Sequence, residues 1–294
     1  MIVHLVDGTY ELFRQFYAPR PGHVDDDGVE VGATRGVVTS MLGMIEQGAT
    51  HLGVATDHVI ESFRNDLWPG YKSSAGMDPL LVAQFPLLED ALGALGVTVW
   101  PMVDYEADDA LASAAAVAQA NPRVEQVIIC TPDKDLGQCV GGKVVQLDRR
   151  QEKLLDRDGV EAKFGVPPES IPDFLALVGD SADGFPGLPG FGAKTAAALL
   201  RRYVHLEAIP NEAAAWDVEG IRGADKLAAT LKAGRQVADL FKDLATLRTD
   251  ADIGFVDDWR WRGPSAAFAS WCERFGSPRL AERAQQLARA RRVS

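Results

Sequence analysis

Short apolar runs that end in an acidic residue alternate with longer segments of helical spacing along the first half of the chain. Residues 2–7 (Ile-Val-His-Leu-Val-Asp) and 52–57 (Leu-Gly-Val-Ala-Thr-Asp) are two such runs. Between them, residues 33–47 repeat apolar side chains at helical intervals, and Gly48 follows as a residue that suits a helix end. This order of patterns predicts a β-α-β unit.

The same alternation continues to about residue 150. We expect helices at 79–95 and 106–120, and strands at 97–101, 126–131 and 143–147. Strands that are separated by helices imply a mostly parallel, doubly wound sheet with helices on its faces. The predicted fold class is therefore α/β.

Beyond about residue 160 the strand patterns nearly vanish, and the composition becomes helical with Pro and Gly between the segments. No internal repeat and no low-complexity linker separates this part from the first. We predict an α/β lobe at residues 1–160 that is followed directly by a helical lobe at residues 161–294.

Composition limits the class of protein. The chain has 294 residues and 47% hydrophobic content, which is ordinary for a globular protein with a sizeable core. It lacks an apolar stretch of membrane-spanning length, and its N-terminus leads into a strand without the features of a signal peptide, so we expect a cytoplasmic protein that contacts no membrane. Three widely spaced cysteines, Cys130, Cys139 and Cys272, argue against a disulfide framework and against a zinc cluster.

The net charge of −12 argues against nucleic acid as a ligand, because phosphate binding normally needs a basic surface. Basic residues nevertheless occur in groups, and each group is either a solvated surface or a phosphate contact. These groups are Arg149 with Arg150, Lys194 with Arg201 and Arg202, and the Arg-rich segment from Arg279 to Arg292.

Acidic residues change the picture more than the net charge does. Nine carboxylates occur in five short clusters, most of them just after a predicted strand. They are Asp7; Asp57; Glu106, Asp108 and Asp109; Asp133 and Asp135; Asp180 and Asp183. The carboxyl ends of the strands in an open α/β sheet share one edge, so these acids are expected to converge there.

Converging carboxylates cannot all stay ionised without cations. Oxygen ligands favour Mg²⁺ or Mn²⁺, and a pair of such ions suits in-line attack on a phosphodiester. The pattern predicts a metal-dependent nuclease. A simpler explanation exists for single clusters: Glu106, Asp108 and Asp109 open a helix, where acids also cap and match the helix dipole, and surface turns also produce close acid pairs.

The segment that follows Asp57 mixes basic and aromatic residues. Arg64 and Lys72 are candidates for stabilising the transition state of phosphoryl transfer. Phe63, Trp68 and Tyr71 suit stacking on the bases of a single strand, although aromatics also anchor ordinary surface loops.

Residues 187–197 (Gly-Leu-Pro-Gly-Phe-Gly-Ala-Lys-Thr-Ala-Ala) join a tight turn to an Ala-rich helix. Gly190 and Gly192 let backbone N–H groups approach a phosphate, and Lys194 and Thr195 lie at the helix start to assist. The string is typical of a helix-hairpin-helix element that holds a duplex by its backbone. The alternative is an ordinary corner between two packed helices. The glycine spacing does not fit a P-loop.

Together these residues resemble the 5′-nuclease family of flap endonucleases, typified by the N-terminal nuclease domain of bacterial DNA polymerase I and by phage 5′-exonucleases. The resemblance covers nearly the whole chain, and the matching blocks occur in order. They are Leu5 to Gly8 with Arg14; Asp57 with Phe63-Arg64 and Tyr71-Lys72; Tyr105 to Asp109; Thr131 to Leu136; Gly179 to Thr195; and Leu244 to Asp250.

The resemblance implies that all nine acids hold two Mg²⁺ or Mn²⁺ ions, that a helical arch forms near residues 59–78, and that a K⁺ ion binds at the hairpin near 186–197. It also implies DNA contacts from Arg14, Tyr71 and the hairpin residues Gly190, Gly192, Lys194 and Thr195. Two departures stand out: the family's basic residue shortly after Tyr71-Lys72 is absent at residues 73–76, and the arch segment is short.

We therefore expect a divalent-metal-dependent 5′–3′ exonuclease and flap endonuclease of replication and repair that acts as a monomer. Its expected substrate is branched or nicked duplex DNA with a 5′ flap or end, with RNA–DNA hybrids as a further candidate. The chain leaves no room for a polymerase, so a stand-alone nuclease is expected. Two alternatives are a PIN-like RNA nuclease, which lacks the hairpin lobe, and a catalytically weak binder of branched DNA, which would tolerate loss of the acids.

Overall fold

The computed structural model describes residues 1–19 and 22–293 of the chain. They form two compact units that are discontinuous in sequence. The first comprises residues 1–60, 74–131 and 249–294, and the second comprises residues 61–73 and 132–248. This division differs from the continuous lobes 1–160 and 161–294, which stay a prediction; the last residue of the predicted helical lobe, Ser294, lies outside the described residues.

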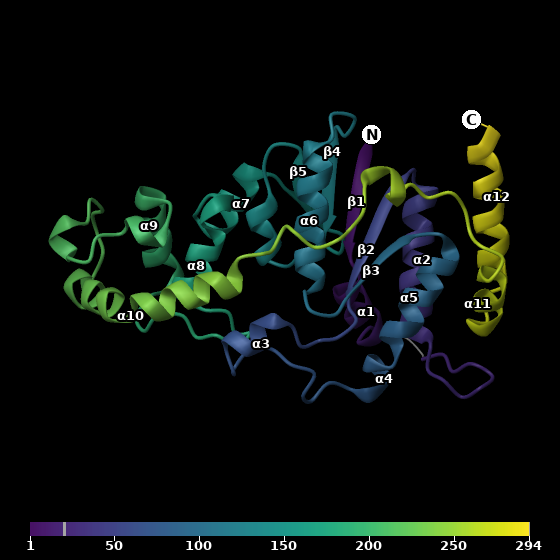
Figure 1. Cartoon of the computed structure of the whole chain (residues 1–294), viewed down its shortest axis with the longest axis horizontal. Helices are drawn as coiled ribbons and strands as arrows, with labels where there is room; N and C mark the ends of the chain where they lie inside the picture. The colour runs from purple at the N-terminus through teal and green to yellow at the C-terminus, as the bar shows by residue number, and fades with distance from the viewer. Residues whose placement is uncertain (20–21, 294) are drawn as a thin grey trace. The chain divides into compact units, whose positions relative to one another are not determined.

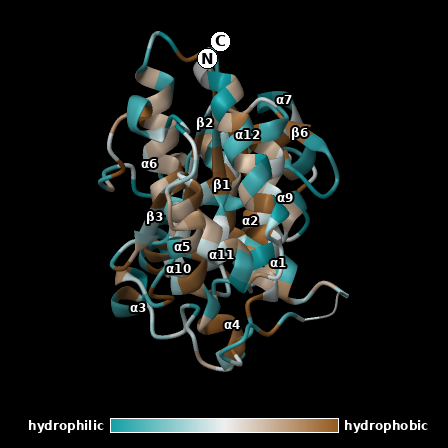
Figure 2. Ribbon diagram, turned by 90° about the vertical axis from the view of Figure 1, so that its right-hand side faces the viewer, coloured by the Kyte–Doolittle hydropathy of each residue, from teal (hydrophilic) through white to brown (hydrophobic). Residues whose placement is uncertain are grey.

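A parallel sheet forms the centre of the first unit. Its strands run in the order β3-β2-β1-β4. Their bounds are β1 (Ile2–Asp7), β2 (His51–Asp57), β3 (Thr98–Met102) and β4 (Gln126–Cys130). All residues of β2 are buried, which explains why this strand is a nearly continuous apolar run rather than an alternating one. Figure 2 colours β1, near the centre of the view, largely hydrophobic.

Helices cover both faces of this sheet (Figure 1). Helix α6 connects β3 to β4, on the other side of the sheet, and packs on all four strands. Helices α1 and α2 connect β1 to β2, and α5 connects β2 to β3, so these connections run along the sheet in the opposite direction. These three helices pack together. Right-handed crossovers place these two groups on opposite faces. The helices of this unit are α1 (Gly8–Phe16), α2 (Gly32–Glu46), α4 (Pro79–Val82), α5 (Gln84–Leu95), α6 (Ala107–Ala120), α11 (Phe268–Arg274) and α12 (Arg279–Val293).

One predicted helix is divided in two. The apolar spacing over residues 79–95 predicts a single helix, but the structure has α4 and α5 with a break at Ala83. Pro86 explains the break, because it has no N–H to donate to the carbonyl of Val82 four residues earlier.

The C-terminal segment from Thr249 onward packs beside β2 and β3. The indole N–H of Trp100 donates to the carbonyl of Ile253 at 3.1 Å, and the rings of Trp100 and Trp259 meet edge to face at 5.3 Å. Gly53 of β2 provides the space, because a Cβ at this position would lie 2.0 Å from the Trp100 ring. Tryptophan contacts therefore fix this late segment to the sheet.

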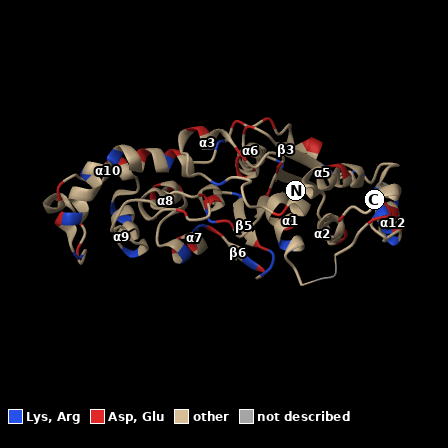
Figure 3. Ribbon diagram, turned by 90° about the horizontal axis from the view of Figure 1, so that it is seen from below, with Lys and Arg blue, Asp and Glu red and all other residues tan. Residues whose placement is uncertain are grey.

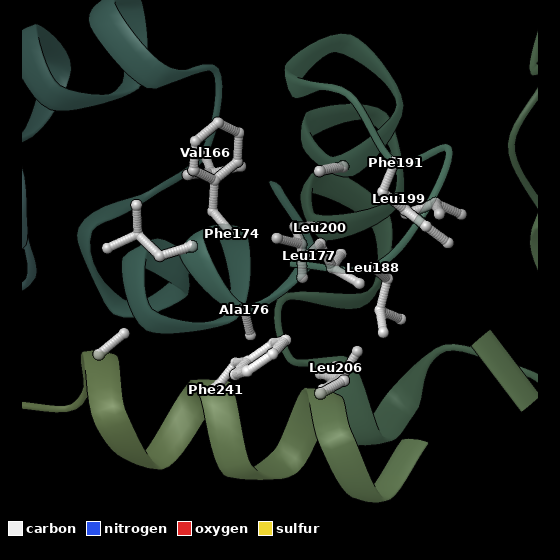
Figure 4. Packing of buried hydrophobic residues seen from close by; sticks show 14 of the residues in the cluster. Val166, Phe174, Ala176, Leu177, Leu188, Phe191, Leu199, Leu200, Leu206 and Phe241 are labelled. Carbon is white, nitrogen blue, oxygen red and sulfur yellow. The ribbon is translucent and has the colours of Figure 1, made fainter. Parts of the chain in front are cut away.

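The second unit is mainly helical. It contains a β-hairpin of β5 (Val144–Asp148) and β6 (Lys153–Leu155), which pair antiparallel. Its helices are α3 (Phe63–Leu67), α7 (Arg157–Phe164), α8 (Ile171–Val178), α9 (Ala193–Tyr203) and α10 (Ala224–Ala245). Leu199 and Leu200 of α9, Phe174 of α8 and Phe241 of α10 belong to one buried cluster (Figure 4).

The turn between α8 and α9 depends on two glycines. Gly179 and Gly187 both have positive φ, and a Cβ on Gly187 would lie 2.3 Å from the backbone nitrogen of Gly179. Only residues without a side chain fit such a close approach. The predicted fold class is confirmed: a mostly parallel α/β sheet flanked by helices accompanies a helical part with a helix-hairpin-helix element. Within the described residues, the structure contains no helix that could span a membrane.

Candidate metal centre

Two of the predicted ligands end adjacent parallel strands in the first unit. Asp7 is the last residue of β1 and Asp57 the last of β2, and Asp7 is paired with Ala55 in the β1–β2 register. Asp7 accepts hydrogen bonds from the backbone N–H of Tyr10 at 2.8 Å and from the hydroxyl of Thr131 at 2.9 Å. Both carboxylates are nearly buried and fixed at the carboxyl edge of the sheet.

Helix α6 brings Glu106 and Asp109 to the same edge. The backbone N–H of Ala107 donates to Asp57 at 2.7 Å, which ties the start of α6 to the end of β2. Asp109 is fully buried and accepts from the backbone N–H of Glu106 at 3.0 Å as part of a capping box, while Asp108 is half-buried. The capping explanation for this cluster is thus correct for Glu106 and Asp109, which form the capping box, and Asp108 lies in the first turn of α6, where a negative charge suits the helix dipole.

A second group of acids lies in the second unit. Carboxylate oxygens of Asp135, Asp180 and Asp183 lie within 4.8 Å of one another. Asp133 accepts a hydrogen bond from the backbone N–H of Asp135 at 3.0 Å. Asp180 begins the loop after α8, and its carboxylate accepts from the backbone N–H of Ala182 at 2.9 Å. The structure therefore brings together Asp135, Asp180 and Asp183 in the second unit, and in the first unit it places Asp7 and Asp57 at the ends of neighbouring strands.

Burial and charge make this second group electrostatically strained. Burial raises the pKa of Asp135 well above its ordinary value, and the negative charges of Asp133, Asp183 and Asp180 raise it further. Lys134 counteracts part of this charge, since its ammonium lies 2.7 Å from Asp180. Burial alone would lower the pKa of Lys134, but the hydrogen bond to Asp180 and the acidic charges outweigh it, and the pKa is raised.

The donor set of this group fits a hard divalent cation. One carboxylate oxygen of Asp135, Oδ1, is buried and has no hydrogen-bond partner among the described residues. A buried oxygen that bonds to nothing costs free energy unless a cation or a proton satisfies it. Oxygen atoms from several carboxylates are the ligands that Mg²⁺ and Mn²⁺ prefer.

The strain at Asp135 leads to a prediction about stability. Because the folded-state pKa of Asp135 is raised, ionising this carboxyl destabilises the fold at pH values above the unfolded-state pKa, and the penalty is absent below it. Without divalent ions, Asp135→Asn is therefore expected to raise Tm at neutral pH by roughly 2–4 °C. Thermal melts of the wild type and of Asp135→Asn in chelator, at pH 7 and near pH 4, measure this difference in Tm. A higher Tm for the wild type than for Asp135→Asn at pH 7 would contradict the prediction.

The two basic side chains with a predicted catalytic role, Lys72 and Arg64, differ in their surroundings. The ammonium of Lys72 lies 3.8 Å from Asp183 and is partly exposed, so it remains available to a substrate beside the acids. The Arg64 side chain is 1% exposed, and its guanidinium donates to the carbonyl oxygens of Leu244 at 2.8 Å and Thr246 at 3.2 Å. These bonds give Arg64 a structural function at the end of α10, and its predicted catalytic role stays a prediction.

The aromatic residues of the same segment are packed into the second unit. Trp68 donates its indole N–H to the carbonyl of Gly184 and meets the ring of Phe241 edge to face at 5.1 Å. Tyr71 belongs to the hydrophobic core of the unit. This packing favours the alternative in which the aromatics anchor the loop, and base stacking by Tyr71 stays a prediction.

The predicted phosphate-binding hairpin ends at an open helix start. Gly190 has a φ of +87°, and Gly192 is the N-cap of α9 without a side-chain hydrogen bond to the first turn. Gly192 and Lys194 are exposed and Thr195 is half-buried. The first N–H groups of α9 are thus not capped by the side chain of the N-cap residue, as a backbone anion site requires. DNA binding by these four residues stays a prediction.

Arg14 lies in the last turn of α1 and forms an ion pair with the buried Glu11. It also lines a cavity of about 570 Å³ together with Arg35 and Thr39 of α2. Its predicted contact with DNA stays a prediction.

Three residues without a predicted role hold the acids in position. Thr131 donates to Asp7, and the hydroxyl of Thr9 accepts from the backbone N–H of Asp57 at 2.9 Å. Lys134 pairs with Asp180. The position of Lys134 between two aspartates indicates in the sequence that it contacts acids. The sequence gives no such indication for Thr9 and Thr131, because the aspartates that they contact are distant in sequence.

Comparison with known proteins identifies the relatives of this chain. Residues 2–165 match the family model described as 5′–3′ exonuclease, N-terminal resolvase-like domain, and residues 166–267 match the model described as 5′–3′ exonuclease, C-terminal SAM fold. DNA polymerase I of Pseudomonas aeruginosa is 36% identical over 269 residues, which cover 88% of this chain and 28% of that protein. A 5′–3′ exonuclease of Aquifex aeolicus is 32% identical over 210 residues, or 70% of this chain and 71% of that one.

The chain spans only about a quarter of the polymerase relatives, with 25% and 28% of the Rhizobium leguminosarum and Pseudomonas aeruginosa proteins covered. Among solved structures, a T5 5′-exonuclease with bound zinc superposes with a TM-score of 0.65 at 18% identity and 98% coverage of both chains. Flap endonuclease-1 from Methanococcus jannaschii gives a TM-score of 0.62 at 15% identity, with 98% and 91% coverage. At such low identity these likenesses establish the fold.

Proposed function

Because this chain belongs to the 5′–3′ exonuclease family, we propose that it is a divalent-metal-dependent nuclease that hydrolyses DNA from a 5′ end and cleaves 5′ flaps. The observation that carries the proposal is the acidic group of the buried Asp135 and Asp180 with the half-buried Asp183, in which Oδ1 of Asp135 has no hydrogen-bond partner among the described residues. A family relationship alone would also fit an inactive relative, whereas such a group is costly to keep unless it binds cations.

In this proposal all nine acids ligate two shared Mg²⁺ or Mn²⁺ ions. Asp7 and Asp57 end neighbouring parallel strands, and Asp135, Asp180 and Asp183 lie around a common point. They offer the carboxylate oxygens that these ions prefer.

The remaining chemistry belongs to the side chains of the protein. Bound divalent ions would lower the pKa of a water nucleophile and stabilise the charge that develops on the departing oxygen. Lys72, beside Asp183, would donate a hydrogen bond to a phosphate oxygen as its negative charge increases. Lys134 neutralises Asp180 and so limits repulsion between the acids and the phosphate.

The hairpin would hold the duplex by its backbone. The exposed start of α9 offers N–H groups and the positive end of the helix dipole to a phosphate, with Lys194 beside them. A K⁺ ion held at the hairpin is part of this proposal. Contacts of this kind give affinity for duplex DNA without sequence preference.

We expect Lys194→Ala to weaken duplex binding by a similar factor for every sequence and to lower the slope of log affinity against log salt by about 1, because one phosphate contact is lost. Fluorescence anisotropy over a salt series measures both quantities. Lys232→Ala is the control, since this lysine forms an exposed ion pair with Glu212. An unchanged salt slope in Lys194→Ala would show that Lys194 contacts no phosphate.

The experiment that tests the function is incubation of the full chain with an end-labelled 5′-flap duplex, in Mg²⁺, in Mn²⁺ and in chelator, beside single-stranded RNA. We expect short 5′ products from the flap substrate that depend on the metal. Tight flap binding without cleavage in either metal would favour a non-catalytic binder of branched DNA. A preference for unstructured RNA would favour a PIN-like RNA nuclease.

A further inference from the structure

Three arginines line a cavity of about 900 Å³ in the first unit. The cavity is lined by Thr50, Trp261, Ala288 and the three arginines Arg260, Arg262 and Arg291. Thr50 directly precedes β2, so the cavity lies at the amino end of this strand, whereas Asp57 lies at its carboxyl end. The cavity is therefore distinct from the acidic edge of the sheet.

The backbone orients two of the arginines toward the same side. Arg260 forms an antiparallel bridge with His51 at the start of β2, and the N–H of Trp261 donates to the carbonyl of Thr50 at 2.9 Å. In this extended segment alternate side chains face opposite sides. Trp261 is 4% exposed and points into the core, where its indole N–H donates to the carbonyl of Leu95, while Arg260 and Arg262 are exposed.

The third arginine is fixed by α12. The guanidinium of Arg291 lies 5.3 Å above the centre of the Trp261 ring and donates to the carbonyl oxygens of Ala49, at 2.9 Å, and Ile45. These contacts hold the Arg291 side chain at a fixed position beside the cavity. Burial lowers its pKa somewhat, but an arginine remains protonated at neutral pH. Figure 3 shows the basic residues on α12.

One acid, Asp257, interacts electrostatically with Arg262, but its ion pair is with Arg123. The pKa of Asp257 is lowered mainly by a hydrogen bond from Arg123, whose guanidinium lies 2.7 Å from the Asp257 carboxylate. The charge of Arg262 lowers this pKa to a smaller extent. Among the residues that the structure describes, neither Arg260 nor Arg262 takes part in a side-chain ion pair. In a chain with a net charge of −12, such a concentration of positive charge needs an explanation.

We infer that this cavity, defined by Arg260, Arg262 and Arg291, binds a phosphate group of a nucleotide-sized ligand. Guanidinium groups match phosphate because their N–H groups can donate to two of its oxygens at once, and the exposed side chains of Arg260 and Arg262 bring two positive charges to a phosphate monoester or diphosphate. The volume is within the range of small-molecule sites and is far larger than a single ion needs. The phosphate could come from a free nucleotide or from a DNA strand.

Titration of the full chain with inorganic pyrophosphate, in chelator so that no divalent ion bridges the anion to the acids, tests the inference by calorimetry. We expect saturable binding by the wild type. The double variant Arg260→Gln/Arg262→Gln should lose about tenfold or more in affinity, because two charged hydrogen-bond donors are removed. Both side chains are exposed, so the variant is expected to keep the Tm of the wild type.

The control is Arg222→Gln/Arg289→Gln, which removes the same charge from exposed positions outside the cavity, Arg289 being on α12 itself. It should bind pyrophosphate as the wild type does. Competition then identifies the source: displacement by a nucleoside 5′-monophosphate indicates a free nucleotide, and displacement by blunt duplex DNA indicates a strand. Equal affinity in Arg260→Gln/Arg262→Gln, no saturable binding by the wild type, or tighter binding of polyglutamate than of pyrophosphate would each overturn the inference.

Discussion

Asp180→Asn is expected to lower the rate of flap cleavage by roughly 10³-fold or more, because a metal ligand supplies several kcal/mol of transition-state stabilisation. The substitution keeps the shape of the side chain and the acceptor for the N–H of Ala182, so the loop after α8 should persist. It removes the negative charge that holds Lys134 at 2.7 Å and that a divalent cation would need.

The same variant should bind the flap duplex at least as well as the wild type in chelator, since one negative charge less faces the phosphates. Single-turnover cleavage and anisotropy on the same DNA separate the two effects. Asp158→Asn, an exposed acid in the first turn of α7, is the matched control and should cleave normally. Cleavage by Asp180→Asn within about threefold of the wild type would contradict a ligand role, since ligand loss costs far more than that.

Lys72→Ala should reduce turnover by about 10²–10³-fold while changing DNA affinity much less, because a donor to the reacting phosphate acts mainly on the transition state. The backbone of Lys72 is held on both sides: its N–H donates to the carbonyl of Asp183 at 3.0 Å, and its carbonyl accepts from the Asn65 side chain at 2.9 Å. The ammonium is therefore delivered beside the acids at a defined position.

Measured kcat and Kd for Lys72→Ala, compared with those of Lys194→Ala, test this assignment. Lys194→Ala should weaken binding and leave single-turnover cleavage at saturating DNA unchanged. If Lys72→Ala instead loses equal factors in affinity and in turnover, Lys72 only holds the substrate.

Local pattern was enough to predict the strands and the acids at their ends. β1 and β2 are short, buried and apolar, and each is closed by an aspartate, so their positions follow from neighbouring residues alone. The adjacency of Asp7 and Asp57 then follows from the parallel arrangement that the intervening helices impose.

Contacts between residues distant in sequence could not be predicted in this way. The bond of Trp261 to Thr50, which brings the C-terminal segment back to the first unit, leaves no trace in periodicity. A boundary at residue 160 marks the change in composition, but composition does not report that residues 249–294 return to the sheet.

Residue type also leaves the function of Arg64 and Tyr71 open. A basic and an aromatic residue suit a nucleic-acid surface and a buried anchor equally well. The choice for Arg64 depends on the carbonyls of Leu244 and Thr246, 180 and 182 residues later in the chain, and the choice for Tyr71 depends on the core of the second unit. Here the tertiary structure favours the anchor.

Anomalous diffraction from crystals of the full chain grown with Mn²⁺ and a flap duplex is the most direct test of a shared two-ion centre. We expect two Mn²⁺ peaks whose oxygen ligands, at about 2.0–2.6 Å, come from the nine acids, including Asp7 and Asp135. A single ion, or no ion among the nine acids while the crystals diffract well, would contradict it.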